Sequence, residues 1–300
     1  MRQKPLGTSD LTVGAIAYGC WRFADTNIKD AISKIETALD CGMSLIDTAD
    51  IYGFGEPAGF GGAEAKLGNV LAARPDLREH MTLATKGGII PPRPYDSSYD
   101  YLMAAIDASL TRLGVDQVDL YQIHRPDLIA PLSETARALD DMVKTGKTRF
   151  IGVSNFTVAQ TRALQAHLDA PIVSTQPEFS AIEQSPITDG TLDWSSETGA
   201  TVLAWSPLAG GALATGNYTE ADKTRFGRIM ETVKTIAKSH DATTTQVALA
   251  FTLFHQANII PIIGTQHVDR IKEAAAATEL TLEAREFYDI IEAYRDAPMP

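Results

Sequence analysis

The chain has 300 residues and a formal net charge of −12, which argues against nucleic acid and anionic membrane surfaces as partners, because both require clustered basic residues. Hydrophobic residues make up 44% of the chain, an ordinary share for a globular protein, and this length lies within the range of a single α/β barrel. We therefore expect one domain, residues 1–300.

The cysteines and the N-terminus argue against further classes of protein. Cys20 and Cys41 form no CxxC pair and lack a histidine at zinc-ligand spacing, so we expect no disulfide framework and no metal. Basic residues precede the apolar run 11–20 as in a signal peptide, but polar residues at 8–10 interrupt that transition. No run approaches the roughly 18 apolar residues of a membrane span. We expect a cytoplasmic protein.

A turn signal at residues 7–10 predicts an N-terminal β-hairpin, and beyond it short apolar runs alternate with longer segments of helical period. Eight runs predict strands, at residues 13–19, 44–48, 81–85, 118–123, 149–154, 172–176, 201–205 and 259–263. Strands that alternate with helices run parallel, and eight of them close a barrel. The predicted fold class is an α/β protein with one (β/α)8 TIM barrel.

Helical period is clear between the strands. Residues 28–40 and 101–113 have apolar stripes that face a core. Glycines follow the helices where these should end before the next strand, at Gly42, Gly114, Gly146 and Gly199. Two helical stretches, 225–239 and 245–256, precede the eighth strand, where a regular barrel needs one. We expect one or two extra helices.

Two segments, 56–62 and 208–220, lack a clear period and predict loops near a site. Residues 53–58 also match the loose dinucleotide fingerprint GxGxxG/A after a predicted strand. That fingerprint requires an acidic residue after the next strand, which here ends in Thr85 and Lys86, and no Rossmann halves surround it. We interpret the match as accidental and place this loop beside a substrate pocket.

The ends of the predicted strands are unusually polar. The polar or small residues at or just after these ends, in chain order, are Asp47 with Tyr52 five residues later, Lys86, His124, Ser154 with Asn155, Gln176, Trp205 with Ser206, and Gly264 with Thr265. In α/β barrels the reactive residues come from these ends and from the loops that follow them. The sequence therefore predicts an active site there.

Five motifs give the chain a strong resemblance to the aldo-keto reductase family. They are DTADIYG at 47–53, LATK at 83–86, DLYQIH at 119–124, GVSNF at 152–156 and AWSPL at 204–208. The resemblance covers nearly the whole chain and is greatest to the short-tailed bacterial oxidoreductases. It implies hydride transfer between a nicotinamide dinucleotide and a small-molecule carbonyl compound.

The resemblance makes Tyr52 the proton donor, Asp47 and Lys86 its supporting pair, and His124 the residue that orients the carbonyl. A free tyrosine has a pKa of about 10, and a neighbouring ammonium stabilises the phenolate. We therefore expect Lys86 to lower the pKa of Tyr52. A histidine N–H can polarise the carbonyl as hydride arrives.

The resemblance also implies the contacts of the cofactor. Ser154, Asn155 and Gln176 would bind the nicotinamide carboxamide, Trp205 would stack on the ring where the family more often has Tyr, and Ser206 and Leu208 would contact the pyrophosphate. Gly264 permits close approach of a phosphate. The adenosine end would meet Gly264, Thr265, Gln266, His267, Arg270 and Glu273.

Arg270 is the natural partner of a 2′-phosphate, which favours NADP(H). Gln266 and Ala274 depart from the family pattern, which leaves use of NAD(H) open.

The substrate pocket is predicted to include Trp21, Phe54 and Phe60, which favour an apolar compound, and Arg125, which favours an acidic one. The choice between them stays open, as does the oligomeric state. A redox-sensing regulatory module resembling potassium-channel β-subunits is the alternative function. A sugar isomerase on an unrelated barrel leaves the motif at 152–156 unexplained.

Overall fold

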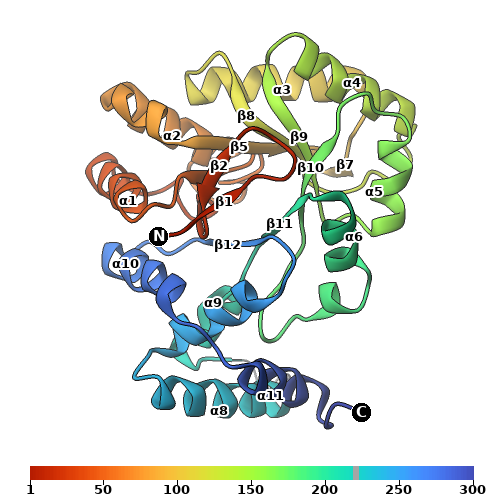
Figure 1. Cartoon of the computed structure of the whole chain (residues 1–300). Coiled ribbons are helices and arrows are strands. Elements are labelled where there is room, and N and C mark those ends of the chain that lie inside the picture. Colours follow the sequence, from red (N-terminus) through yellow and green to blue (C-terminus); the bar gives the residue numbers. More distant parts are fainter. Residues whose placement is uncertain (219–222) are drawn as a thin grey trace.

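The computed structural model describes residues 1–218 and 223–300, apart from the side chain of Lys223. Eight parallel strands close a barrel in the order β10-β11-β12-β3-β4-β5-β8-β9 (Figure 1). These strands are β3 (Ala17–Gly19), β4 (Leu45–Asp47), β5 (Thr82–Gly87), β8 (Val118–Ile123), β9 (Thr148–Ser154), β10 (Ile172–Gln176), β11 (Thr201–Ala204) and β12 (Ile259–Ile263). The predicted fold class is confirmed.

Helices surround the barrel. They are α1 (Ile28–Asp40), α2 (Gly62–Ala73), α3 (Tyr99–Leu113), α4 (Leu132–Lys144), α5 (Val158–Gln165), α6 (Thr191–Thr198), α9 (Thr244–Phe254) and α10 (Val268–Ala276). Outside this regular pattern lie α7 (Ala212–Thr215), α8 (Lys223–Ser239) and α11 (Ala284–Arg295). Short 3-10 turns occur at Pro75–His80, Ser185–Ile187, Ala209–Gly211 and Ala277–Glu279. Helix α8 packs on α11 and α9 on β12, so α8 and α11 are the extra helices (Figure 1).

The sequence explains the boundaries of the helices. The stripe of α1 buries Ala31 and Ile35, and the Asn27 side chain caps its first turn by accepting a hydrogen bond from the Asp30 amide at 3.0 Å. Helix α3 ends at Gly114, whose φ of 67° is adopted most readily by glycine, which has no Cβ. The other predicted stop glycines also have positive φ, as expected.

The run 13–19 was wrongly predicted to be one strand. Its first part is β2 (Thr12–Gly14), which pairs antiparallel with β1 (Gln3–Pro5), and only β3 enters the barrel. The apolar residues of both parts are buried, because the hairpin covers the N-terminal end of the barrel, where Leu6 and Val13 join the inner core cluster. The predicted N-terminal hairpin is therefore confirmed, but an apolar run alone did not show where the chain turns.

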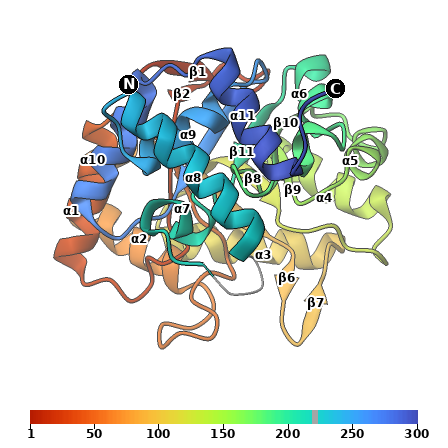
Figure 2. The same cartoon turned by 90° about the horizontal axis from the view of Figure 1, so that it is seen from below.

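Two further segments differ from the expectation. Part of the predicted loop 208–220 forms a 3-10 turn and α7, because glycines divide it into units too short to show a helical period; its residues 219 and 220 lie outside the described part. After β5 an unpredicted hairpin forms from β6 (Ile89–Ile90) and β7 (Arg93–Tyr95). Figure 2 shows this hairpin projecting from the end of the barrel opposite β1 and β2.

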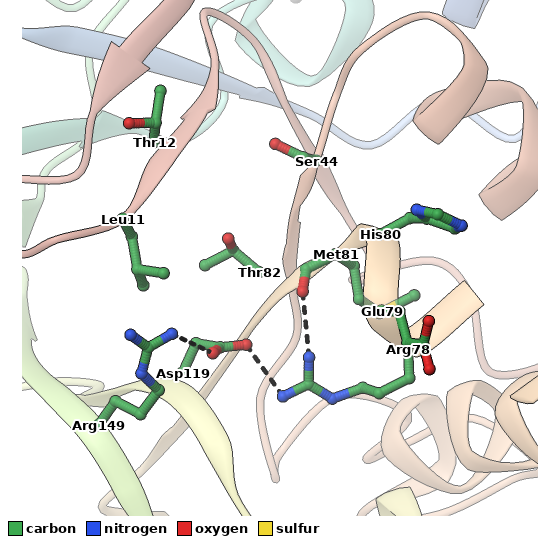
Figure 3. Close-up of a pocket in the computed structure, with 10 residues that line it drawn as sticks. All are labelled: Leu11, Thr12, Ser44, Arg78, Glu79, His80, Met81, Thr82, Asp119 and Arg149. Atoms are coloured by element: carbon green, nitrogen blue, oxygen red, sulfur yellow. Dashed lines mark hydrogen bonds and ion pairs between the residues drawn. The ribbon is translucent and has the colours of Figure 1, made fainter. Parts of the chain in front are cut away.

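At the N-terminal end of the barrel, Asp119 joins neighbouring strands beside a cavity of about 350 Å³ (Figure 3). Its Oδ2 accepts a hydrogen bond from the Leu83 amide at 2.8 Å and lies 3.0 Å from the Arg78 guanidinium, while Oδ1 lies 3.3 Å from Arg149. Asp119 is the second residue of β8, and His124 follows the same strand at its other end. We therefore interpret the charged side chains around Asp119 as a stabilising cluster, remote from the polar strand ends at the other end of the barrel.

Replacing Asp119 by Ala should lower the free energy of unfolding by about 1–3 kcal/mol, because the buried Leu83 amide then lacks an acceptor. Urea denaturation followed by circular dichroism measures this change. The control is Asp169→Ala, which removes an ion pair to Lys144 between two largely exposed side chains and should change stability by under about 0.5 kcal/mol. Equal losses in the two variants would contradict the role of Asp119.

Candidate active site

The predicted catalytic residues meet at the C-terminal end of the barrel. Lys86, at the end of β5, is fully buried, and its Nζ lies 2.7 Å from Asp47 Oδ2 at the end of β4. The same Nζ donates to the Thr48 carbonyl at 2.7 Å and to the Tyr52 hydroxyl at 3.3 Å. One ammonium group therefore joins the carboxylate to the phenol.

His124 completes this group from the end of β8. Its ring centroid lies 5.7 Å from that of Tyr52, and the two rings are almost perpendicular at 80°. Its Nδ1 is buried and has no hydrogen-bond partner among the described residues. The imidazole therefore keeps hydrogen-bonding capacity that the surrounding protein does not use.

Burial and charge determine the protonation of the site. Burial favours neutral Lys86, but Asp47 and Tyr52 outweigh it and raise the pKa of Lys86. Burial, together with the positive charges of Lys86 and Arg125, lowers the pKa of His124 well below its usual value. Near neutral pH the site therefore contains an ammonium group beside a neutral imidazole.

The expected lowering of the tyrosine pKa was wrong. Burial raises the pKa of Tyr52, and the opposing effect of Lys86 does not fully compensate, partly because the negative charge of Asp47 also disfavours the phenolate. The ammonium limits the rise without reversing it. Tyr52 is therefore a protonated phenol at neutral pH, in the state required of a proton donor.

Two glutamines extend the hydrogen bonds of Asp47. Gln176, at the end of β10, donates to Asp47 Oδ1 at 3.0 Å, and Gln122 of β8 donates to the same oxygen at 3.5 Å. Gln122 and the Thr48 carbonyl were not predicted; the only signal for Gln122 is a polar residue within an apolar strand. The predicted cofactor residue Gln176 thus contacts the catalytic group directly.

Ser154, Asn155 and Trp205 lie in one hydrogen-bonded chain beside His124. Asn155 Nδ2 donates to the His124 carbonyl at 3.1 Å and to Ser154 Oγ at 3.0 Å, and Trp205 Nε1 donates to Asn155 Oδ1 at 3.0 Å. Asn155 adopts a positive φ of 59°, which is uncommon for a residue with a Cβ. Backbone strain of this kind often occurs at functional sites. Trp205 follows β11 instead of lying within it.

The remaining predicted cofactor residues lie at the same end of the barrel. Ser206 and Leu208 follow β11, and the Ser206 hydroxyl accepts a hydrogen bond from the Gly210 amide at 3.0 Å. After β12, the Thr265 carbonyl accepts from the Tyr18 hydroxyl at 3.1 Å. Gly264 leaves space around its Cα, because a Cβ there would come no closer than 3.6 Å to the carbonyl oxygen of Gly19.

Arg270 and Glu273 project from α10, and Arg270 is exposed. No ion pair of Arg270 is found among the described residues, so its guanidinium is available to a ligand. The predicted Gln266 is held instead by two neighbours, since its Oε1 accepts from Thr26 Oγ1 and from Lys34 Nζ, each at 3.1 Å.

The predicted substrate residues are less tightly grouped. Trp21 and Phe54 are exposed by 59% and 55%, on loops after β3 and β4, and Arg125 next to His124 is half-buried. The ring of Phe60 lies 5.9 Å from the guanidinium carbon of Arg112 on α3. Trp21, Phe54 and Arg125 therefore lie at the C-terminal end of the barrel. Phe60 packs against α3.

The described residues contain neither a metal site nor a membrane span. Within residues 1–218 and 223–300, no group of three or more His, Cys, Asp and Glu residues is arranged to hold a metal ion. No helix in the same residues has the length and apolar character to cross a membrane.

Comparison with known proteins identifies the class. Residues 15–295 match the Aldo/keto reductase family, and the chain belongs to that family. It is 46% identical over 299 residues to a 6-dehydroglucose reductase of Novosphingobium aromaticivorans, with 99% of this chain and 97% of the relative covered. It is 36% identical to a 6-dehydroglucose reductase of Agrobacterium fabrum, with 93% and 94% covered.

A solved structure agrees with this family assignment. The thermostable aldo-keto reductase Tm1743, determined with the inhibitor epalrestat, superposes with a TM-score of 0.83 at 28% identity, covering 98% of this chain and all of that one. The chain is therefore an oxidoreductase of a family that reduces carbonyl compounds with nicotinamide cofactors.

The imidazole of His124 should titrate well below the pH at which a free histidine does, because burial and two nearby positive charges lower its pKa. Nitrogen-detected NMR of the ring measures this, with His124→Gln to assign the signal. In Lys86→Met the pKa of His124 should rise, because a nearby positive charge is removed, yet it should stay below the usual value because burial is the larger cause. A wild-type His124 signal that titrates at about pH 6.5, the value of a free histidine, would contradict the lowered pKa.

Proposed function

We propose that this chain reduces an aldehyde to an alcohol with NADPH, with Tyr52 as the proton donor. The observation that supports this most is the position of Lys86 Nζ, 3.3 Å from the Tyr52 hydroxyl and 2.7 Å from Asp47 Oδ2. Reduction of a carbonyl adds hydride to carbon and a proton to oxygen. The site contains a protonated phenol with a buried cation beside it, which suits the second of these events.

Each residue has a separate task. His124 donates a hydrogen bond to the carbonyl oxygen and polarises it. Tyr52 gives its proton to that oxygen, and Lys86 stabilises the phenolate that remains. Asp47 keeps Lys86 protonated and in position, held in turn by Gln176 at 3.0 Å. The hydroxyl of Tyr52 then regains a proton from solvent, which completes the cycle.

The residues at the strand ends fit a nicotinamide dinucleotide, which supplies the hydride when bound. The fit is supported by the amide and hydroxyl groups beside His124, by the unused His124 Nδ1 and by the space around Gly264. We propose that Ser154, Asn155 and Gln176 bind the carboxamide, that Trp205 stacks on the nicotinamide, and that Ser206 and Leu208 contact the pyrophosphate. The hydrogen bond from Trp205 Nε1 to Asn155 fixes one edge of the indole ring.

NADP(H) is the proposed cofactor, because the exposed Arg270 can pair with a 2′-phosphate. Gly264, Thr265, Gln266 and Glu273 would surround the adenosine.

A dehydro-sugar aldehyde is the proposed substrate class. The relative from Novosphingobium, 46% identical over 99% of this chain, is named a 6-dehydroglucose reductase. Arg125 and Glu178 add charged groups near the site: Glu178 follows β10 and is bridge-paired with Trp205, and burial together with Glu183 raises its pKa while Arg125 opposes the rise. Such groups suit a substrate with many hydroxyls better than an apolar one.

Steady-state oxidation of NADPH tests this function against 6-dehydroglucose and matched aliphatic, aromatic and acidic aldehydes. We expect kcat/KM for 6-dehydroglucose to exceed that for the aliphatic aldehyde by at least about 100-fold, because buried polar groups would be unpaired with the smaller compound. A preference for aromatic or acidic aldehydes would overturn the substrate class. Binding of the dinucleotide without turnover of any aldehyde would instead favour a redox sensor.

Tyr52→Phe should lower kcat by about 10²–10⁴-fold, the usual contribution of general acid catalysis, because the proton donor is removed. The Kd for NADPH should stay close to that of the wild type, since the phenol hydroxyl is not among the proposed cofactor contacts. Because the pKa of Tyr52 is raised, wild-type kcat should show no loss from its deprotonation below about pH 10.

The matched control is Tyr288→Phe, which removes the hydroxyl of a tyrosine on α11 that is 45% exposed and should leave kcat unchanged. Retention of more than about a tenth of the wild-type kcat by Tyr52→Phe would exclude Tyr52 as the proton donor.

A further inference from the structure

Lys34 of α1 is a buried lysine whose ammonium group forms no ion pair among the described residues. The residue is only 7% exposed, and its Nζ donates to two neutral oxygens, Thr26 Oγ1 and Gln266 Oε1, each at 3.1 Å. No carboxylate lies within ion-pair distance of it in the described part of the chain. Burying an ammonium group without a negative partner is unfavourable, so a lysine in this state is suited to an anion that binds from outside.

A cavity of about 240 Å³ adjoins this lysine, between α1 and the start of α10. Lys34, Gln266 and His267 line it, together with Asp30 and Asp269. The two aspartates are exposed, and the carboxylate of Asp30 accepts a hydrogen bond from the Asn27 side chain that caps the same helix. Their repulsion of an anion is weakened by solvent, whereas the buried ammonium is screened much less.

The cavity is lined in part by the segment proposed for the adenosine of the cofactor, because Gln266 and His267 lie in the loop between β12 and α10. Figure 1 shows α1 and α10 side by side, and their packing brings residue 34 next to residue 266 although 232 positions separate them in the sequence. Arg270 does not line this cavity. A phosphate in this cavity would therefore meet Lys34 from α1, with Arg270 on α10 outside the cavity lining.

We propose that Lys34 binds the 2′-phosphate of NADP(H) and determines the preference for NADP(H) over NAD(H), which rests on the proposed cofactor. Lys34 Nζ exchanges its hydrogen bond to Gln266 for one to a phosphate oxygen. The freed Gln266 amide can then contact the adenosine ribose. Because NAD(H) has a hydroxyl in place of the phosphate, it gains nothing from the ammonium group.

The test measures binding of NADP⁺ and NAD⁺ to the full chain by isothermal titration calorimetry, without any turnover. Lys34→Met keeps the length of the side chain and removes its charge. A hydrogen bond to a charged group corresponds to about a 10- to 100-fold change in Kd, so we expect a loss of that size for NADP⁺ and less than about threefold for NAD⁺. Lys34→Gln, which retains hydrogen-bonding groups, gives a second measure if Lys34→Met folds poorly.

Two controls locate the effect. Lys29→Met removes an exposed charge from the same helix and should leave both Kd values unchanged. Lys34→Arg keeps the charge and should retain most of the preference for NADP⁺. Arg270→Ala measures how much Arg270 contributes to the affinity for NADP⁺. The double variant with Lys34→Met should lose more of this affinity than either single variant.

The results separate failure of this proposal from failure of the proposed function. Equal losses for NADP⁺ and NAD⁺ in Lys34→Met would show that Lys34 only ties α1 to the loop after β12, and unchanged NADP⁺ binding would remove it from the phosphate site. In both cases the wild type still binds NADP⁺. A wild-type chain that binds neither dinucleotide would overturn the proposed function itself.

Discussion

The buried ion pair between Lys86 and Asp47 is the interaction on which the site depends. Neither charge is accessible to water, so each requires compensation from the protein, and the pair is surrounded by the Thr48 carbonyl, the Gln176 amide and the Tyr52 hydroxyl. Removing one partner would leave the other charge buried and uncompensated. The barrel supplies this compensation because groups from three of its strand ends and the loop after β4 converge on one ion pair.

The barrel places stabilising contacts at its N-terminal end and the candidate active site at its C-terminal end. Near the start of strand β8, Asp119 holds two arginines and a backbone amide at the N-terminal end of the barrel, and His124 follows the strand at the other end. Residues only five positions apart therefore serve different purposes. The active end contains strained backbone, such as the positive φ of Asn155, whereas the opposite end is covered by the β1–β2 hairpin, with Leu6 and Val13 in the inner core.

Burial lowers the pKa of His124 and raises the pKa of Tyr52, and both shifts favour the neutral ring. It disfavours the imidazolium of His124 and the phenolate of Tyr52, so both rings are neutral near pH 7. Consideration of the nearest charge alone predicted a lowered pKa for Tyr52. That prediction failed because desolvation depends on everything packed around the hydroxyl, which the spacing of residues along the chain does not contain.

The sequence by itself determined the order of strands and helices, because apolar periodicity and glycine stops are local properties, and it determined Asp47, Lys86 and His124 as neighbours, because parallel strand ends meet at one rim. Tertiary structure alone divided the run 13–19 between a hairpin and the barrel, since both parts are equally apolar. It also brought Lys34 of α1 beside Gln266, a contact between distant segments that no local pattern records.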